Sequence, residues 1–271
     1  MVDHKIKQFV YDTWGSSDIN RFPGPQPISI ERRHFNHIKN HKYLVCEKTD
    51  GVRHILVCFM DGPLKLCALV NRSFEYRLVS LTVHKNTLLD GELIGDTFIV
   101  HDAVCINGED LRTMNLIERL SRVKALCKVI IPAAIKVVAK PMIPLFDIKR
   151  LSLSPETDGI ILTPVNEPVR LGTHRTMFKW KECLKNTVDF IVRDGYLCVQ
   201  SDSKFVKIQE VQGAPEGKIL ECVYRLGNWT PIITRTDKSH PNNLRTFDRT
   251  KVNISENITL DELKDEFGKG D

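Results

Sequence analysis

The sequence predicts an α+β protein of two domains, both built mainly from short strands. Between residues 43 and 105, apolar segments of four to eight residues alternate with turn sequences, which is typical of strands joined by short connections. Residues 114–130 have apolar side chains at helical spacing and predict the clearest helix. Beyond residue 187 almost every apolar segment is strand-like again. We therefore expect a first domain at residues 1–187, a second at 188–255, and a C-terminal helix and tail at 256–271.

The remaining elements follow from local patterns. Residues 27–40 lie at the end of a proline-rich stretch and predict a short helix, capped by Ser29 or a neighbour. Residues 156–165 and 177–182 predict two more strands. In the second domain, short strands separated by Gly, Asp and Pro are typical of a small barrel or sandwich. The tail has a helical pattern, with Thr259 as its N-cap.

Composition limits the class of protein. The net charge of +5 permits a phosphate-rich partner but does not require one. The eight cysteines form no C-x-x-C pair, which argues against a zinc ribbon, and most lie in apolar runs as small buried residues would. Reduced thiols favour the nucleus or cytoplasm, of the host cell if the protein is viral. Lysines and prolines interrupt the most apolar stretch, residues 129–146, so we expect a soluble protein without a membrane span.

Charged residues interrupt two apolar segments at residues 45–59, where Lys48, Asp50 and Arg53 surround Gly51. An Asp-Gly pair between apolar segments is a strong signal for a hairpin turn, and a solvated turn would explain the charges. The alternative is a functional site. Five further charged interruptions along the chain favour the alternative.

The six interruptions form an ordered series. They are K-T-D-G-V-R at 48–53, V-N-R-S-F-E at 70–75, L-L-D-G-E-L-I at 88–94, E-T-D-G-I-I-L at 156–162, M-F-K-W-K at 177–181 and R-T-D-K-S-H-P-N at 235–242. This series resembles the covalent nucleotidyltransferases, a superfamily of mRNA capping guanylyltransferases and polynucleotide ligases. The upstream F-P-G-P-Q-P-I-S-I, the F-K-W-K form and the terminal Pro-Asn are most similar to capping guanylyltransferases. The resemblance covers residues 22–242.

The resemblance implies a ligase-like nucleotidyltransferase domain of antiparallel sheets with helices, followed by an OB-fold β-barrel domain. It also implies a reaction. Lys48 would displace pyrophosphate from GTP, carry GMP as a lysyl-N-GMP intermediate, and pass it to the 5′-diphosphate end of RNA to form the GpppN cap. A lysine amine attacks only after losing its proton, and nearby cations such as Lys179 and Lys181 would favour the neutral amine.

The resemblance assigns roles to the other motif residues as well. Arg53 and Arg72 would contact ribose and phosphate, with Thr49 also binding substrate. Glu92 and Asp158 would be metal-site and ribose-side carboxylates, and such oxygen ligands suit Mg²⁺ or Mn²⁺. Both acids belong to Asp-Gly sequences, so a hairpin turn is the alternative explanation for them, and we favour the functional role. Lys179 and Lys181 would meet the phosphate, although a period of two also places both on the polar face of an edge strand.

The base-binding residue departs from the family pattern, which has an aromatic residue before Asp. Here His101 precedes Asp102, so His101 would stack on guanine, or Phe98 would replace it. Ile161 would meet the opposite face of the base. His84, His174 and His240 show no metal-ligand spacing, and we interpret them as surface or loop residues.

The last motif provides Arg235, Asp237 and Lys238, which would grip the β and γ phosphates when the second domain closes over GTP. An ATP-dependent RNA or DNA ligase is the alternative enzyme, and a catalytically silent RNA-binding module is the alternative without chemistry. The sequence contains no H-C-x-x-x-x-x-R phosphatase signature and no glycine-rich methyltransferase loop. RNA triphosphatase and cap methyltransferase would then be separate proteins or lie in regions beyond this sequence.

Overall fold

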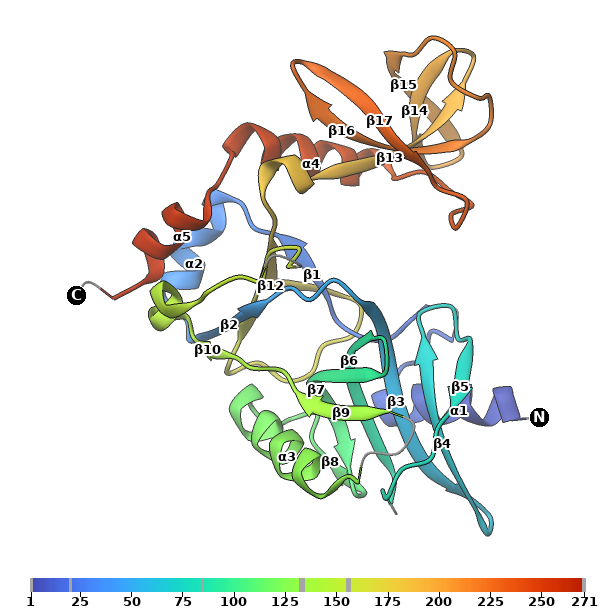
Figure 1. Cartoon of the computed structure of the whole chain (residues 1–271), viewed down its shortest axis with the longest axis vertical. Helices are drawn as coiled ribbons and strands as arrows, with labels where there is room; N and C mark the ends of the chain where they lie inside the picture. Colours follow the sequence, from blue (N-terminus) through green and yellow to red (C-terminus); the bar gives the residue numbers. More distant parts are fainter. Residues whose placement is uncertain (1, 20, 84, 132–134, 155–156, 270–271) are drawn as a thin grey trace. The chain divides into compact units, whose positions relative to one another are not determined.

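The structure of the chain is a computed structural model (Figure 1). It describes residues 2–19, 21–83, 85–131, 135–154 and 157–269. The chain forms two units. The first runs from the N-terminus to Ile28 and continues with His37–Lys179, and the second combines Ser29–Asn36 with the chain from Trp180 onward. Sheets and helices occur in both units, which confirms the α+β class. The boundary expected near residue 187 stays a prediction.

The first unit contains two sheets. The larger has the order β5-β4-β3-β6-β7-β8, with β9 parallel to β7. Its strands are β3 (Val52–Asp61), β4 (Leu64–Asn71), β5 (Tyr76–Leu78), β6 (Thr87–Ile94), β7 (Thr97–Ile106), β8 (Glu109–Asp110) and β9 (Lys136–Ala139). The smaller has the order β1-β12-β11-β2-β10, with β1 (Gln26–Ser29), β2 (Tyr43–Glu47), β10 (Ile143–Pro144), β11 (Ile160–Pro164) and β12 (Thr173–Trp180). A short η2 helix (Leu145–Arg150) follows β10.

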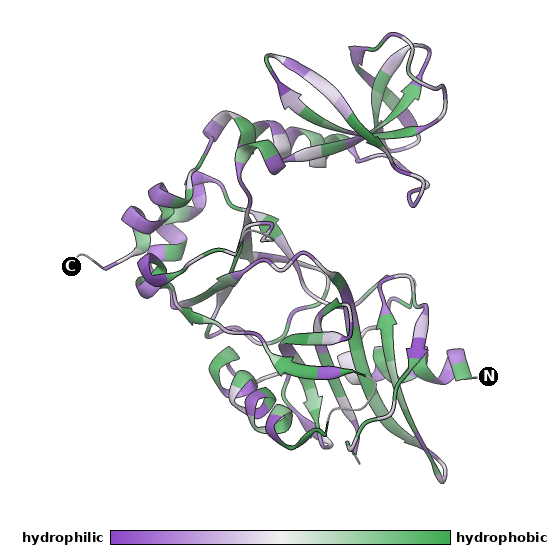
Figure 2. Ribbon diagram, in the orientation of Figure 1, coloured by the Kyte–Doolittle hydropathy of each residue, from purple (hydrophilic) through white to green (hydrophobic). Residues whose placement is uncertain are grey.

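Both faces of the larger sheet are covered, because alternate side chains of each strand point to opposite faces. On one face Leu56, Leu89 and Phe98 pack with Val123 and Leu126 of helix α3 (Leu116–Val129). On the other face, residues of β3, β4 and β6 pack with Ile6, Val10 and Trp14 of helix α1 (Val2–Trp14). The strands are accordingly mostly hydrophobic in Figure 2. A sheet buried on both faces is a rigid platform for a site at its edge.

The segment from Lys48 to Gly51 joins the two sheets, since β2 belongs to the smaller sheet and β3 to the larger. The hairpin explanation for this segment is therefore wrong. Gly51 is needed for close approach: a Cβ atom there would lie 2.8 Å from the Glu92 Cγ and 2.8 Å from the Leu93 carbonyl oxygen. The glycine thus lets the connection lie directly against β6.

The second unit contains a five-stranded sheet of order β15-β14-β13-β16-β17. Its strands are β13 (Thr187–Arg193), β14 (Tyr196–Ser201), β15 (Lys204–Glu210), β16 (Ile219–Arg225) and β17 (Asn228–Thr234). Helix α4 (Leu244–Glu256) places Phe247 on Phe190 and Trp229, at ring-centroid distances of 5.9 and 5.8 Å. No backbone pairing joins β15 to β17 in the part of the chain that the structure describes.

The described helices follow the sequence pattern in part. The expected helices at 114–130 and in the tail are confirmed as α3 and α5 (Leu260–Phe267), and Thr259 caps α5 by accepting a hydrogen bond from the Glu262 amide at 3.1 Å. The helix expected from residue 27 is shorter, because β1 occupies Ser29. Its place is taken by η1 (Arg32–His34) and α2 (Phe35–Lys39), with Glu31 at the N-cap. Helices α1 and α4 and the short η3 (Cys183–Lys185) were not expected.

The cysteines are reduced, as their positions in apolar segments predicted. All eight cysteines are free, and six of them are buried. None of the helices in the described ranges is both long enough and apolar enough to span a membrane. His84 and Glu156, which the sequence analysis mentioned, lie outside the described residues.

Candidate active site

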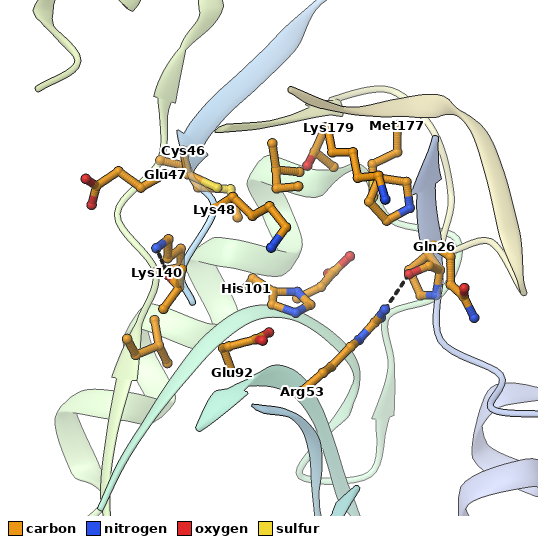
Figure 3. Close-up of a pocket in the computed structure, with 18 of the residues that line it drawn as sticks. Gln26, Cys46, Glu47, Lys48, Arg53, Glu92, His101, Lys140, Met177 and Lys179 are labelled. Atoms are coloured by element: carbon orange, nitrogen blue, oxygen red, sulfur yellow. Dashed lines mark hydrogen bonds between the residues drawn. The ribbon is translucent and has the colours of Figure 1, made fainter. Parts of the chain in front are cut away.

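A cavity of about 270 Å³ lies in the first unit, between the smaller sheet and residues of β3, β6 and β7 of the larger sheet. Figure 3 shows Lys48 and Lys179 entering it from one side, and Arg53, Glu92 and His101 from the other. Other lining residues used below are Pro25, Cys46, Thr49, Arg72, Ile99, Asp102, Lys140, Ile161 and Met177. The structure thus brings eight predicted site residues, Lys48, Thr49, Arg53, Arg72, Glu92, His101, Ile161 and Lys179, to one cavity.

Lys48 is held at the end of β2 by backbone pairing with the segment before β11. Its amide donates to the Gly159 carbonyl at 2.8 Å, and its carbonyl accepts from the Asp158 amide at 3.1 Å. This pairing places the two side chains together, and the Lys48 Nζ donates to Asp158 Oδ2 at 2.6 Å. Both side chains remain partly exposed, at 25% and 17%. A primary amine beside a proton acceptor in an accessible cavity can act as a nucleophile.

Arg53 is fixed by two partners. Its Nε and Nη2 donate to the Asp90 carboxylate at 2.9 and 2.5 Å. Its Nη1 donates to the Pro25 carbonyl at 2.6 Å, the bond drawn as a dashed line at Arg53 in Figure 3. Burial alone would raise the pKa of Asp90, but Arg53 holds it below its usual range. Arg53 and Arg72 also share the Phe22 ring, with guanidinium carbons 5.1 and 5.9 Å from its centroid. Two cations on one side of the cavity suit an anionic ligand.

His101 projects into the cavity because β7 carries a bulge at this point. Asp90 of β6 pairs with Asp102, whereas Gly91 pairs with Val100, so His101 is the extra residue. Burial lowers the pKa of His101, although Asp90, 3.6 Å away, opposes that change. Phe98 points the other way into the core and is fully buried, so the proposal that it replaces His101 is wrong. Gly91 makes this possible, because a Cβ atom there would lie 2.7 Å from the Phe98 ring.

Lys140 also lines this cavity, although it was not predicted as a site residue. The side chain is buried, and its Nζ donates to the Thr49 hydroxyl. Burial raises the pKa of the Glu92 carboxyl, while Lys48, Arg53 and Lys140 act in the opposite direction. The signal in the sequence that could have identified Lys140 is its position as a charged residue within an apolar stretch. Burial also raises the pKa of the adjacent Cys46 to about 11, so this thiol is not a competing nucleophile at neutral pH.

The remaining predicted residues of the first unit differ in position. Ile161 of β11 and Lys179 of β12 line the cavity, as expected. Lys181 follows the end of β12 at Trp180, belongs to the second unit, and is not among the residues that line the described cavity. His174 was interpreted as a surface or loop residue, and this is wrong: it is 5% exposed on β12 and lies 3.2 Å from the Thr176 hydroxyl. His240 is exposed, as expected.

In the second unit, Arg235, Asp237 and Lys238 form a cluster of their own. Arg235 donates twice to Asp237, at 2.8 and 2.7 Å, and its Nη1 lies 3.2 Å from Glu221 and 3.3 Å from Asp189. Lys238 donates to Asp189, which is buried. Arg235 lowers the pKa of Asp237 to about 2. In this structure the two cations are therefore paired with carboxylates of their own unit.

The carboxylates fit a divalent ion only together with a substrate. In the described part of the chain, no group of three or more His, Cys, Asp or Glu residues is arranged to hold a metal ion. Glu92 nevertheless lines the cavity, and Asp158 accepts a hydrogen bond from Lys48, which also lines it. Mg²⁺ commonly takes one or two protein carboxylates and completes its shell with water and substrate phosphates. The donor set fits that kind of binding.

Comparison with known proteins identifies the family. The model of the mRNA capping enzyme catalytic domain matches residues 2–183, and that of the mRNA capping enzyme C-terminal domain matches residues 193–264. An mRNA-capping enzyme subunit alpha from Neurospora crassa is 29% identical, with the alignment covering 72% of this chain and 59% of the relative. An mRNA-capping enzyme from Danio rerio is 26% identical, over 89% of this chain and 48% of the relative.

The chain thus spans about half the length of these two curated relatives. Among solved structures, a ligase domain from M. tuberculosis LigD matches with 13% identity and a TM-score of 0.40, covering 79% of this chain and 72% of that one. A likeness this weak contributes nothing to the assignment. The two family models do, because together they match the chain almost from end to end and the first alone matches well over half of it. The chain belongs to the mRNA capping enzyme family.

Proposed function

We propose that this protein is a GTP:RNA guanylyltransferase that forms the mRNA cap through a covalent intermediate on Lys48. One observation carries the proposal: the Lys48 amine opens into a cavity lined with further cations and lies 2.6 Å from the Asp158 carboxylate. This combines a nucleophile, a proton acceptor and a binding site for phosphates. Membership in the capping enzyme family supports the choice of GTP and RNA as substrates.

The reaction would proceed in two steps. First, Lys48 Nζ attacks the α-phosphorus of GTP; an N–P bond forms, the bond to the bridging oxygen breaks, and pyrophosphate leaves. Asp158 already accepts a hydrogen bond from Nζ, so it is placed to take the proton. Second, a terminal oxygen of the RNA 5′-diphosphate attacks the same phosphorus, the N–P bond breaks, and Nζ regains a proton. Covalent catalysis divides one difficult transfer into two easier ones.

The cavity would accommodate the nucleoside and the phosphates as follows. His101 and Ile161, from different sheets, would hold the two faces of guanine. Arg53 and Arg72, with Thr49, would contact ribose and phosphate, and Lys179 would meet the α-phosphate. Burial lowers the pKa of Arg72, and repulsion from the neighbouring Arg53 lowers it further. Such repulsion is expected when two cations are placed to bind the same anion. We retain Lys181 as a phosphate contact, although it lies outside the described lining.

Glu92 and Asp158 would hold a divalent ion, Mg²⁺ or Mn²⁺, once GTP is bound. Such an ion would neutralise charge that develops on the phosphate oxygens. Glu92 has the raised pKa of a buried carboxylate, and a bound cation would favour its ionised form. Asp158 would need to turn from Lys48 toward the ion, or serve both.

The second unit would supply phosphate contacts for the first step. Arg235 and Lys238 would meet the β and γ phosphates and orient pyrophosphate, with Asp237 holding Arg235 in place. We also propose that the five strands form a partly open OB-fold barrel. The supporting observation is Gln209 of β15, whose side-chain amide donates to the Trp229 carbonyl at 2.9 Å and accepts from its amide at 2.7 Å. This side chain links the two edge strands where backbone pairing would close a barrel.

The proposed partners are GTP, RNA with a 5′-diphosphate end, and RNA triphosphatase and cap methyltransferase activities supplied by separate proteins or by regions beyond this sequence. Neither the phosphatase signature nor the glycine-rich loop occurs in this sequence. A role in mRNA capping suits the nucleus, or the cytoplasm for a virus that replicates there. The free cysteines agree with a reducing compartment.

The test is incubation with α-labelled GTP or α-labelled ATP and Mg²⁺ or Mn²⁺, followed by a denaturing gel. We expect label on the protein from GTP only, released when unlabelled pyrophosphate or diphosphate-ended RNA is added. Labelling from ATP alone would support the ligase alternative. Absence of label from both nucleotides would support a silent RNA-binding module and contradict the proposal.

A further inference from the structure

Arg119 of helix α3 is one of the most completely buried charged residues, with a side chain only 3% exposed. Its Nε and Nη2 donate to the two oxygens of Asp102 at 2.7 and 2.9 Å. Its Nη1 donates to the Met114 carbonyl at 2.6 Å and the Glu167 carbonyl at 3.2 Å. One guanidinium thus joins strand β7, the start of α3 and the connection between β11 and β12.

The three segments belong to different sides of the cavity. β7 is part of the larger sheet and contributes His101, whereas β11 and β12 are part of the smaller sheet and contribute Ile161 and Met177. Helix α3 also packs against both sheets, with Val123 in the core of the larger sheet and Leu120 beside Leu44 of β2. Arg119 therefore lies where the spacing between the two sheets is fixed.

The strand around His101 has an unusual charge arrangement. Asp90 and Asp102 are direct partners across β6 and β7, and both are buried. Like charges directly opposite each other destabilise a sheet unless each is compensated. Arg53 compensates Asp90, and Arg119 compensates Asp102. The bulged His101 lies next to this pair in β7.

Stability alone does not account for such a pair, because buried ion pairs contribute little more than apolar residues of the same volume. A bidentate guanidinium does provide fixed direction and distance, which a lysine ammonium does not. We infer that Arg119 is a positioning residue for the nucleobase site: through Asp102 and the Glu167 carbonyl, it sets the spacing between His101 and Ile161 across the cavity. This inference rests on the proposed function, in which these two side chains hold the base.

The experiment is a double-mutant cycle on the adduct-forming step. Arg119→Lys keeps the positive charge but cannot make both hydrogen bonds to Asp102. This substitution is combined with His101→Ala. We expect Arg119→Lys to raise the KM for GTP about tenfold with little change in the rate at saturating GTP, as for a misplaced binding group. In the His101→Ala background the same change should raise KM by no more than about twofold, because coupled residues are not additive.

The matched control is Arg122→Lys, one turn along the same helix. Arg122 pairs with Glu109 at the surface, with side chains 50% and 44% exposed, so its replacement should leave KM unchanged. Thermal unfolding of each variant is measured alongside. If Arg119→Lys does not fold at the assay temperature, Asp102→Asn, which keeps the shape of the side chain, replaces it in the cycle.

The outcomes separate the two proposals. Adduct formation by the unaltered protein, together with additive effects of Arg119→Lys and His101→Ala, would overturn the positioning role alone. A loss of the saturating rate with unchanged KM would also contradict it, since that result indicates a general structural role. No GMP adduct in the unaltered protein would overturn the proposed function and this inference with it.

Discussion

The two charged clusters of the molecule differ in their balance of charge. Five Lys and Arg residues line the cavity of the first unit, against three Asp and Glu residues. In the second unit, the two cations Arg235 and Lys238 are surrounded by three carboxylates, those of Asp189, Glu221 and Asp237. The cations of the first cluster outnumber the acids that line an accessible cavity, although Lys48 and Arg53 pair with Asp158 and Asp90, whereas both cations of the second cluster are paired with carboxylates of their own unit.

This difference separates two kinds of phosphate site. An anion entering the cavity meets more cations than carboxylates among the lining residues, and it competes there with Asp158 for Lys48 and with Asp90 for Arg53. A phosphate that reaches Arg235 or Lys238 must compete with Asp189, a buried carboxylate. The cavity should therefore carry the chemistry common to both steps. The second cluster should matter only while a polyphosphate is present.

The largest expected effect concerns Lys48. Lys48→Ala and Lys48→Arg should each reduce adduct formation at least about a thousandfold, because a guanidinium does not lose its proton at working pH. Lys42→Ala, at the exposed residue before β2, is the control and should keep normal labelling. Quantified label per mole of protein provides the comparison. Substantial labelling of the arginine variant would exclude Lys48 as the nucleophile.

The second prediction separates the two steps. Lys238→Ala should reduce adduct formation from GTP by on the order of a hundredfold, as the loss of one transition-state contact does. Once GMP is attached, no β or γ phosphate remains, so the isolated, guanylylated Lys238→Ala protein should pass GMP to diphosphate RNA at near the normal rate. Lys204→Ala, on an exposed part of the same unit, serves as the control. Full adduct formation with failed transfer would assign the motif to RNA binding instead.

A moderate effect is expected at the base site. His101→Ala should weaken GTP use by about 1–3 kcal/mol, the usual contribution of stacking on an aromatic ring, and His101→Phe should preserve or improve it. The KM for GTP in adduct formation measures both variants, with the exposed His4→Ala as control. An unchanged KM in the alanine variant would remove His101 from the base site, and the buried Phe98 could not take its place.

The smallest effect concerns acid stability. Arg235 holds the pKa of Asp237 at about 2, below the ordinary value of 3.8. A carboxylate with a lowered pKa stabilises the fold above its ordinary pKa, and this contribution is lost as the pH falls from about 4 toward 2. Asp237→Asn should therefore lower the urea midpoint slightly at pH 5 and have a clearly smaller effect near pH 2. An equal difference at both values would show that the ion pair does not contribute through its charge.

Local pattern predicted most strands and helix α3, because alternation and helical spacing are recorded in neighbouring residues. The residues at the cavity were predicted from the resemblance of the six motifs to a known family. Local pattern did not reveal which sheet a strand joins, since pairing depends on distant segments. The Asp50-Gly51 sequence has the pattern of a hairpin but connects two sheets. Lys140 and Arg119 were missed for the same reason: their partners, Thr49 and Asp102, are 91 and 17 residues away.

Periodicity also has a limit at the ends of elements. A period of two places Lys179 and Lys181 on one face only while the strand continues, and β12 ends at Trp180. The bulge at His101 similarly interrupts the alternation of side chains along β7. A strict period of two would therefore assign some residues of this strand to the wrong face. Such irregularities depend on packing against β6 and α3, so the sequence of β7 alone does not predict them.

The central claim is that Lys48 carries the GMP, and mapping the adduct tests it most directly. The protein is incubated with GTP and Mg²⁺, digested under alkaline conditions that preserve a phosphoramidate, and analysed by fragmentation mass spectrometry. We expect one acid-labile GMP, attached to the Lys48 side chain. GMP attached instead to Lys140 or Lys179, the other lysines that line the cavity, would contradict it.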